Sequence, residues 1–196
     1  MSNGRKKTLQ RRSFQALRNT FLTFLFFAWI GWIYEVLVGL LETHMGLVNR
    51  GFLFGPYLPI YGLGGLVLTA LLSPVKKRRL HLGMLPVSPL LVFLGTMAIT
   101  TLLELAGSYV MEGIMGKWLW DYSGYFLNFQ GRIALWSSVK FGLGGIFILY
   151  VLHPLLERGL AGLKERTINI LFAILAAAFM IDLCLRPFLG SNSLLR

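Results

Sequence analysis

The chain of 196 residues is 56% apolar and only 14% charged, whereas a soluble domain carries about 25% charged residues. Its net charge of +11 comes from short clusters beside long apolar runs, which argues against a basic nucleic-acid-binding face. The single cysteine, Cys184, excludes an internal disulfide. The three histidines are far apart and form no ligand motif, so we expect no metal and no cofactor.

Five apolar segments each approach the roughly 20 residues that a helix needs to cross about 30 Å of hydrocarbon. Each is too long and too continuously apolar for a barrel strand. The sequence therefore predicts an all-α integral membrane protein, with a single transmembrane domain over residues 21–187 and a bundle of about five transmembrane helices. These spans are residues 21–41, 57–73, 89–111, 133–155 and 168–186.

The two ends of the chain predict its orientation in the cell membrane. Residues 1–20 form a basic arm that resembles the start of a signal peptide, but the apolar run after it is too long and no small-residue cleavage site follows. Thirteen Lys and Arg residues lie in this arm and the loops on its side, against four in the opposite loops and the tail 188–196. Positive charge stays inside, so we expect a cytoplasmic N-terminus and a C-terminus outside.

A faint repeat links the second and fourth spans. Tyr61-Gly62-Leu63-Gly64-Gly65 matches Phe141-Gly142-Leu143-Gly144-Gly145, and each run follows a span with an embedded glutamate, Glu35 or Glu104. Small residues let membrane helices approach closely. Spans 1–2 and 3–4 are therefore expected to form a parallel two-helix repeat, with a fifth helix left over.

The loop at residues 112–132 is unusually aromatic. It places Trp118, Trp120, Tyr122, Tyr125 and Phe126 among glycine, asparagine and aspartate. One interpretation is an aromatic belt at the outer membrane interface. The other is a re-entrant or lid segment that lines a cavity. Both interpretations remain open at this stage.

Ionisable residues inside the spans are the main functional signal. Glu35, Glu104, Lys140, Asp182 and Arg186 each cost roughly 2.5–3.5 kcal/mol in a membrane, so such residues usually face a bundle interior or a hydrated cavity. The predicted topology places all five toward the outer side. Alternatively, these charges only neutralise one another and fix the helix register.

Span three carries a polar stripe, because Thr100, Glu104, Ser108 and Glu112 recur every four residues and share one helix face. Arg50 and Arg132 each adjoin a glycine and suit carboxylate or phosphate groups. We expect both arginines to meet Glu35 and Glu104 in a cavity open to the outside. The candidate substrate- or ion-binding residues are Glu35, Asn49, Arg50, Glu104, Glu112, Asp121, Tyr122, Asn128, Arg132 and Asp182; no catalytic residue is assigned.

Several motifs together resemble the ABC-transporter type IV (CmpB-like) family of bacterial membrane proteins. They lie between residues 28 and 145 and comprise Gly31-Trp32 with Glu35, the run Asn49-Arg50-Gly51-Phe52-Leu53-Phe54-Gly55-Pro56, Pro59-Ile60-Tyr61-Gly62, Leu119-Trp120-Asp121-Tyr122-Ser123, Asn128 and Gly131-Arg132. The resemblance implies a multi-pass, permease-like transport subunit.

Two other functions remain open beside transport. The chain lacks the G-x-x-x-x-G-K-[ST] motif, so an ATP-driven transporter needs a separate ATPase subunit, for which residues 156–167 are the expected docking segment. Five spans are few for a transporter, so we expect a homodimer surrounded by membrane lipids. The alternatives are a membrane enzyme for a lipid-linked or phosphate-bearing substrate at the outer leaflet, with Glu35, Glu104 and Asp121 as acid or base, and a non-catalytic assembly partner.

Overall fold

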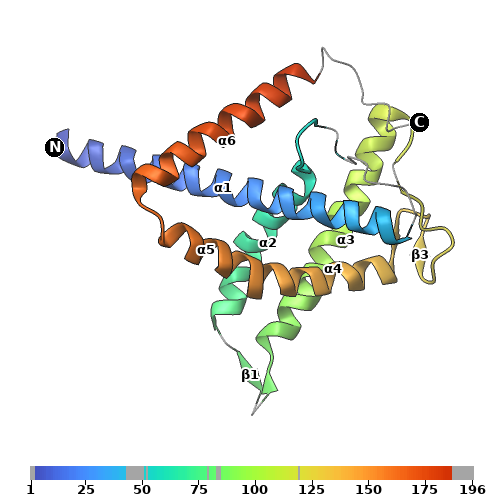
Figure 1. The fold of residues 1–196 in the computed structure, drawn as a ribbon. Coiled ribbons are helices and arrows are strands. Elements are labelled where there is room, and N and C mark those ends of the chain that lie inside the picture. Colours follow the sequence, from blue (N-terminus) through green and yellow to red (C-terminus); the bar gives the residue numbers. More distant parts are fainter. Residues whose placement is uncertain are drawn as a thin grey trace. The chain divides into compact units, whose positions relative to one another are not determined.

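The computed structural model describes residues 3–42, 51, 53–78, 80–82, 85–118 and 120–186. The regular secondary structure of these residues consists of helices and two short antiparallel hairpins (Figure 1). The helices are α1 (Asn3–Glu42), α2 (Pro59–Arg78), α3 (Ser88–Met115), α4 (Leu135–Phe147), the π-helix η1 (Ile148–Leu152), α5 (His153–Ala161) and α6 (Glu165–Leu185). The hairpins pair β1 (His81–Leu82) with β2 (Leu85–Pro86), and β3 (Asn128–Phe129) with β4 (Ile133–Ala134).

The expected number of membrane spans is confirmed within the described residues. Five stretches are long and apolar enough to cross a membrane: Gly4–Leu41, Pro59–Arg78, Ser88–Ile114, Leu135–Ala161 and Glu165–Leu185. The chain divides into two compact units. Unit 1 comprises Met1–Leu66 and Leu156–Arg196, and unit 2 comprises Val67–Leu155.

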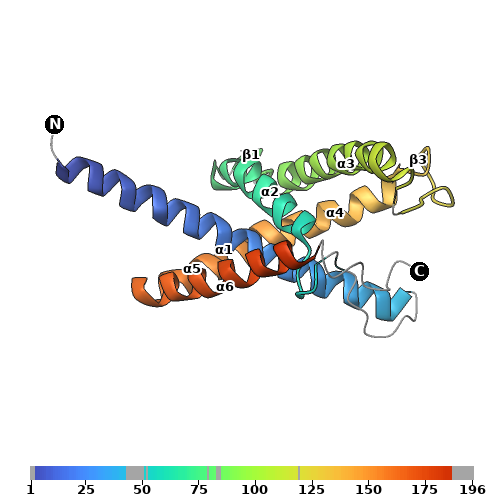
Figure 2. The ribbon, with the colours of Figure 1, turned by 90° about the horizontal axis from the view of Figure 1, so that it is seen from above.

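Unit 1 is organised by the packing of α6 against α1, which it crosses at an angle (Figure 2). Helix α1 includes most of the basic arm, which therefore continues into the first span without a break. At about 1.5 Å per residue, its 40 residues extend roughly 60 Å. Arg18 is buried on α1 and donates to Glu165 and to Asn169 of α6. Edge-to-face contacts of Phe21 with Phe172 and Phe179 extend this packing.

Unit 2 is organised by α3 and α4, which pack side by side (Figure 2). Gly142 and Gly145 of α4 lie against α3, where an added Cβ at Gly142 would approach Phe93 within 2.6 Å. Leu68, Leu72, Val92 and Leu149 form the adjacent buried core. The two glycines remove side-chain bulk and so permit this close contact between helices.

A proline just after the π-helix η1 leaves one carbonyl of that helix without a backbone donor. In a π-helix the carbonyl of Leu149 would accept from residue 154, but Pro154 has no N–H to donate. The Lys76 ammonium of α2 donates to the Leu149 carbonyl instead and lies over the Tyr150 ring. Lys76 therefore satisfies a backbone acceptor that the helix itself leaves open.

Candidate functional site

The polar residues of unit 2 gather where α3 ends at Met115 and α4 begins at Leu135; we call this the loop end of unit 2. Helix α3 stops at Gly116, which has a left-handed φ of 72°. Its N–H donates to the backbone carbonyl of Glu112, as is common at helix C-termini. The following loop returns through the β3–β4 hairpin (Figure 1). It thereby carries tyrosine, tryptophan and arginine side chains back onto α3.

Two of the candidate residues shape this loop. Asp121 accepts hydrogen bonds from the backbone N–H and the hydroxyl of Ser123, which lower the pKa of its carboxyl. Asn128 accepts from the N–H of Gly131 and donates to the carbonyl of Tyr125. Gly131 has a φ of 67°, which glycine adopts without strain. Asp121 and Asn128 are both exposed, and their contacts stabilise the loop.

Glu104 is the carboxyl that the loop reaches. The Tyr122 hydroxyl donates to Glu104 Oε1 at 2.8 Å, and Ser137 of α4 also faces this pair. Burial and the adjacent carboxylate raise the pKa of Tyr122, which therefore remains a donor. Glu104 Oε2 is buried and accepts no hydrogen bond from any described residue. An unpaired buried carboxylate oxygen is costly, so this atom is suited to accept from a ligand or a water molecule.

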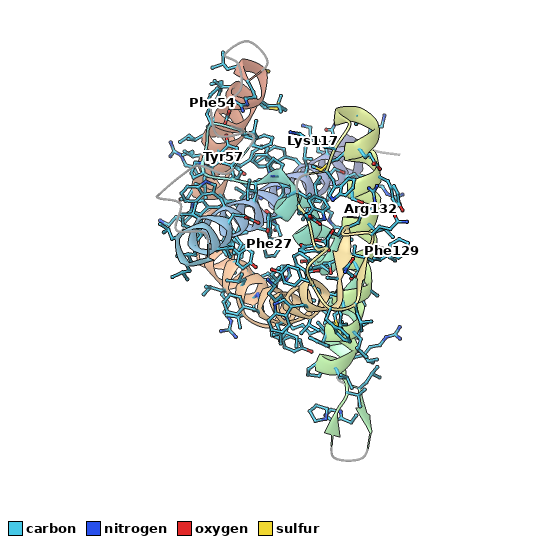
Figure 3. All side chains as sticks on the ribbon, turned by 90° about the vertical axis from the view of Figure 1, so that its right-hand side faces the viewer. Phe27, Phe54, Tyr57, Lys117, Phe129 and Arg132 are labelled. Atoms are coloured by element: carbon cyan, nitrogen blue, oxygen red, sulfur yellow. The ribbon has the colours of Figure 1, made fainter. Side chains whose placement is uncertain are left out.

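Arg132 occupies a second position on the same face of α3. It is buried, donates to Glu112, and lies 3.3 Å from the Ser108 hydroxyl. Its guanidinium is held between two aromatic rings, 4.1 Å from the centroid of Tyr109 and 4.0 Å from that of Trp118. Cation–π contacts and a carboxylate partner together fix the arginine. Figure 3 labels Arg132 beside α3.

The carboxylates of unit 1 have different surroundings. The Tyr61 hydroxyl of α2 donates to Glu35 of α1. Asp182 of α6 accepts from the backbone N–H of Phe54 at 3.0 Å, from that of Gly55 at 2.7 Å, and from the Tyr57 hydroxyl. Arg186 lies over the Phe54 ring, 4.9 Å from its centroid. Figure 3 shows Phe54 and Tyr57 on the α6 side of unit 1.

The predicted site residues are thus distributed over both units. Glu35 and Asp182 belong to unit 1, whereas Glu104, Glu112, Asp121, Tyr122, Asn128 and Arg132 belong to unit 2. Asn49 and Arg50 lie outside the described residues. The expectation that both arginines meet Glu35 and Glu104 in one cavity therefore stays a prediction. Within unit 2, the carboxylate that pairs with Arg132 is Glu112, two helical turns beyond Glu104.

Sequence reasoning missed several residues that take part in these contacts. The hydroxyl donors to Glu35 and Asp182 are Tyr61 and Tyr57, and Ser137 faces Glu104. Tyr61 lies in α2, whereas Tyr57 precedes this helix, so helical spacing gave no signal for the contact between Tyr57 and Asp182. Lys140, one of the five embedded ionisable residues, is exposed, and the expectation that it faces a hydrated cavity stays a prediction.

The chain was compared with models of known protein families. The model described as Putative ABC-transporter type IV matches residues 22–186. The match begins within the first span and ends directly after α6. No curated protein and no solved structure matches the chain.

Proposed function

The chain belongs to the Putative ABC-transporter type IV family, and we propose that it is a permease-like membrane transport subunit with its substrate-binding site at the loop end of unit 2. The observation that carries the proposal is Glu104, a carboxylate in an apolar helix. One oxygen is held by Tyr122, and the other is buried and unbonded within the described residues. Intramembrane carboxylates of this kind commonly mark a substrate or ion path.

The chemistry of the site favours a solute that presents hydrogen-bond donors. Glu104 Oε2 is an acceptor, and the neighbouring Tyr122 and Ser137 hydroxyls can accept as well as donate. Arg132 lies further along the same helix and is already paired with Glu112. The arrangement therefore resembles a binding site for a cationic or amide-bearing solute more than one for a free anion.

The membrane orientation is part of the proposal. The charge asymmetry of the loops supports a cytoplasmic N-terminus and a C-terminus outside, which would make the loop end of unit 2 non-cytoplasmic. A phosphatase reporter fused after Arg196 should be active, and a fluorescent reporter there should be dark. The opposite pattern would require an even number of spans.

The proposed two-helix repeat rests on matched contacts within each unit. Gly62 lies against Phe24 of α1, and Gly142 lies against Phe93 of α3. Three residues further along, Gly65 lies against Phe27, and Gly145 against Thr96. Superposing the α1–α2 pair on the α3–α4 pair in an experimental structure tests the repeat, because unrelated depths of these glycines would contradict it.

Partners complete the proposed transporter. An ATP-driven mechanism requires a separate ATPase, and residues 156–167 remain the proposed docking segment. A homodimer remains the proposed assembly because five candidate spans are few for a transport path. Co-purification of a tagged chain with an ATPase encoded beside it, lost on changing Arg158 and Lys164 to Gln, tests the docking segment.

The function is tested by uptake measurements in cells. Cells that express the wild-type chain, Glu104→Gln or no chain are fed an isotope-labelled nutrient mixture, and accumulated solutes are measured at equal membrane expression. Arg12→Gln, at an exposed position in α1 that lies outside both the site and the docking segment, is the control. We expect one solute to depend on the wild-type chain, to fall at least about tenfold in Glu104→Gln, and to be unchanged in Arg12→Gln.

The two ways of failing are distinguishable. If Glu104→Gln supports normal uptake, the site is misplaced although the chain transports. If no solute depends on the chain, transport itself is wrong. In that case the enzyme acting on a lipid-linked substrate becomes the better candidate, since the carboxyl and hydroxyl groups at the loop end would also suit acid–base chemistry.

A further inference from the structure

The face of α4 that points away from α3 carries features that the transport site does not use. Ser138 bonds to Thr101 of α3, and Gly142 packs on Phe93, so these positions define the side of α4 that faces α3. Trp136, Lys140 and Leu143 are exposed and lie on the opposite side by helical periodicity.

A hollow of about 380 Å³ opens on this exposed face. Tyr125 and Phe126 of the loop form one wall, and Leu135, Trp136 and Val139 of α4 form the other. Phe126 is 81% exposed and Trp136 is 56% exposed. Large apolar side chains with such exposure, gathered around a hollow, favour contact with hydrocarbon over contact with water.

Lys140 places a positive charge beside this hollow. It follows Val139 directly and stands one helical turn after Trp136. Among the described residues it makes no hydrogen bond and no ion pair, although its charge and that of Glu104 attract each other over a longer distance. An exposed lysine inside an apolar span is costly unless its charge reaches the interface or a partner.

The position of Lys140 allows it to reach the headgroup region. It lies five residues after the start of α4 at Leu135, which is about 8 Å along the helix axis. A lysine side chain can extend over such a distance and direct its ammonium toward the interface while its methylene groups stay in apolar surroundings. The ammonium then lies at the same level as the hollow.

We propose that the hollow and Lys140 form a binding site for an anionic lipid. One hydrocarbon chain fills the space between Phe126 and Trp136, and its phosphate pairs with the Lys140 ammonium. Leu143 and Phe147 continue the exposed apolar face of α4, so the rest of the lipid's hydrocarbon chain can pack against this face. A lysine is a flexible point charge, so the site selects a phosphate charge rather than one headgroup shape.

A structural role for Lys140 as the counter-ion of Glu104 fits the geometry less well. Glu104 bonds to Tyr122 and faces Ser137, whereas Lys140 is exposed and makes no ion pair within 4.0 Å among the described residues. Glu104 therefore does not hold the ammonium in place. A membrane phosphate, in contrast, can approach the exposed side of α4 directly.

The test measures lipid binding to the purified full-length chain by native mass spectrometry in detergent. Phosphatidylglycerol and phosphatidylcholine with identical acyl chains are titrated against wild type, Lys140→Gln and Lys117→Gln. Lys117 is an exposed lysine of the neighbouring loop and is the matched control. We expect wild type and Lys117→Gln to prefer phosphatidylglycerol, and Lys140→Gln to lose about tenfold in its affinity.

Two further experiments separate the contribution of the lipid's hydrocarbon chain from that of its phosphate charge. Phe126→Ala should weaken both lipids while keeping the preference for phosphatidylglycerol, because it removes one wall of the hollow. Millimolar inorganic phosphate should not displace the lipid if the hydrocarbon chain is needed. Equal binding of phosphatidylglycerol to wild type and Lys140→Gln overturns the proposal, as does full displacement by phosphate. Equal unfolding temperatures confirm that the variants are folded. The outcome is independent of whether the chain transports a solute.

Discussion

Two helix pairs have related packing but different polar groups: α1 with the first part of α2, Pro59–Leu66, in unit 1, and α3 with α4 in unit 2. In each pair, two glycines spaced three apart lie against the preceding helix, at Phe24 and Phe27 in one and at Phe93 and Thr96 in the other. Each pair carries its glutamate at the same separation beyond the first contact, Glu35 after Phe24 and Glu104 after Phe93.

The differences begin with the donors to these glutamates. Glu35 receives the hydroxyl of Tyr61 from the adjacent helix, whereas Glu104 receives that of Tyr122 from a loop. The loop also supplies Arg132, which unit 2 encloses between aromatic rings. Similar helix packing can therefore support one carboxylate held within a helix pair and another that depends on how a loop folds.

The largest expected effect concerns the glycines that the two pairs share. Gly62→Leu should destabilise the protein by about 3 kcal/mol and Gly142→Leu by about 1–2 kcal/mol, because overpacking usually costs about 1–3 kcal/mol. A Cβ at Gly62 would meet the backbone carbonyl of Phe24 at 2.7 Å, whereas one at Gly142 meets only side-chain atoms of Phe93 and Met97, which can move.

Thermal unfolding in detergent measures this difference. Gly64→Leu and Gly144→Leu are the controls, since an added Cβ at either position has no atom within 4 Å. Both controls should unfold near the wild-type temperature. Equal losses at all four glycines would mean that neither pair depends on close helix approach.

The next largest loss of stability is expected at Asp182 of unit 1, which binds backbone N–H groups, unlike Glu104 and Glu112 of unit 2. Asp182→Asn should cost about 2–3 kcal/mol, because Phe54 donates to one carboxylate oxygen and Gly55 to the other, so the new NH2 group would oppose one of these two N–H donors. Hydrogen bonds to charged groups contribute about 1.5–3 kcal/mol each. Tyr57→Phe removes one donor and should cost about 1 kcal/mol. Urea unfolding followed by tryptophan fluorescence measures both, and a larger loss for Tyr57→Phe would show that the backbone donors matter less than the hydroxyl.

A third comparison concerns Arg132. Arg132→Gln should cost about 2 kcal/mol, because it removes two ring contacts and leaves Glu112 without its partner. Glu112→Gln should cost less than about 1 kcal/mol, since the amide oxygen of the half-exposed glutamine can still accept from Arg132 and the guanidinium keeps its two ring contacts. The double variant gives the coupling energy, for which we expect about 0.5–1 kcal/mol. A coupling of zero would assign the whole effect of Arg132 to the aromatic rings.

The sequence was sufficient for features that depend on composition and periodicity. The number of spans followed from the length of the apolar runs, and the polar face of α3 followed from the four-residue spacing that leads from Glu104 to Glu112. The helical form of the arm was not predicted, although Arg, Lys, Gln and Leu are good helix formers. The basic residues of this arm indicated only the orientation of the protein in the membrane.

Other contacts could not be derived from side-chain patterns. Asp182 binds two backbone N–H groups, and every segment of the chain offers such donors, so no residue type indicates the partner. The pairing of Arg132 with Glu112 depends on the loop between Gly116 and Gly131, which contains left-handed residues at Leu127 and Gln130. Non-glycine residues rarely adopt this conformation, so their local sequence does not indicate it.

The smallest expected loss of stability comes from removing the tyrosine hydroxyl that donates to the glutamate of each helix pair. Tyr61→Phe and Tyr122→Phe each remove one hydroxyl donor, and each should cost about 1 kcal/mol. Tyr122→Phe should cost slightly more, because Glu104 Oε2 already lacks a partner among the described residues and the change would leave Oε1 without its tyrosine. Replacing the carboxylate as well, in Tyr122→Phe with Glu104→Leu, should recover part of the loss, since no buried acceptor then remains. Thermal unfolding of the two single variants and the double variant measures this. If the double variant instead loses the sum of the two single effects, Tyr122 stabilises the loop through its ring and not through Glu104, and the carboxylate would be free to bind a substrate without any movement of the loop.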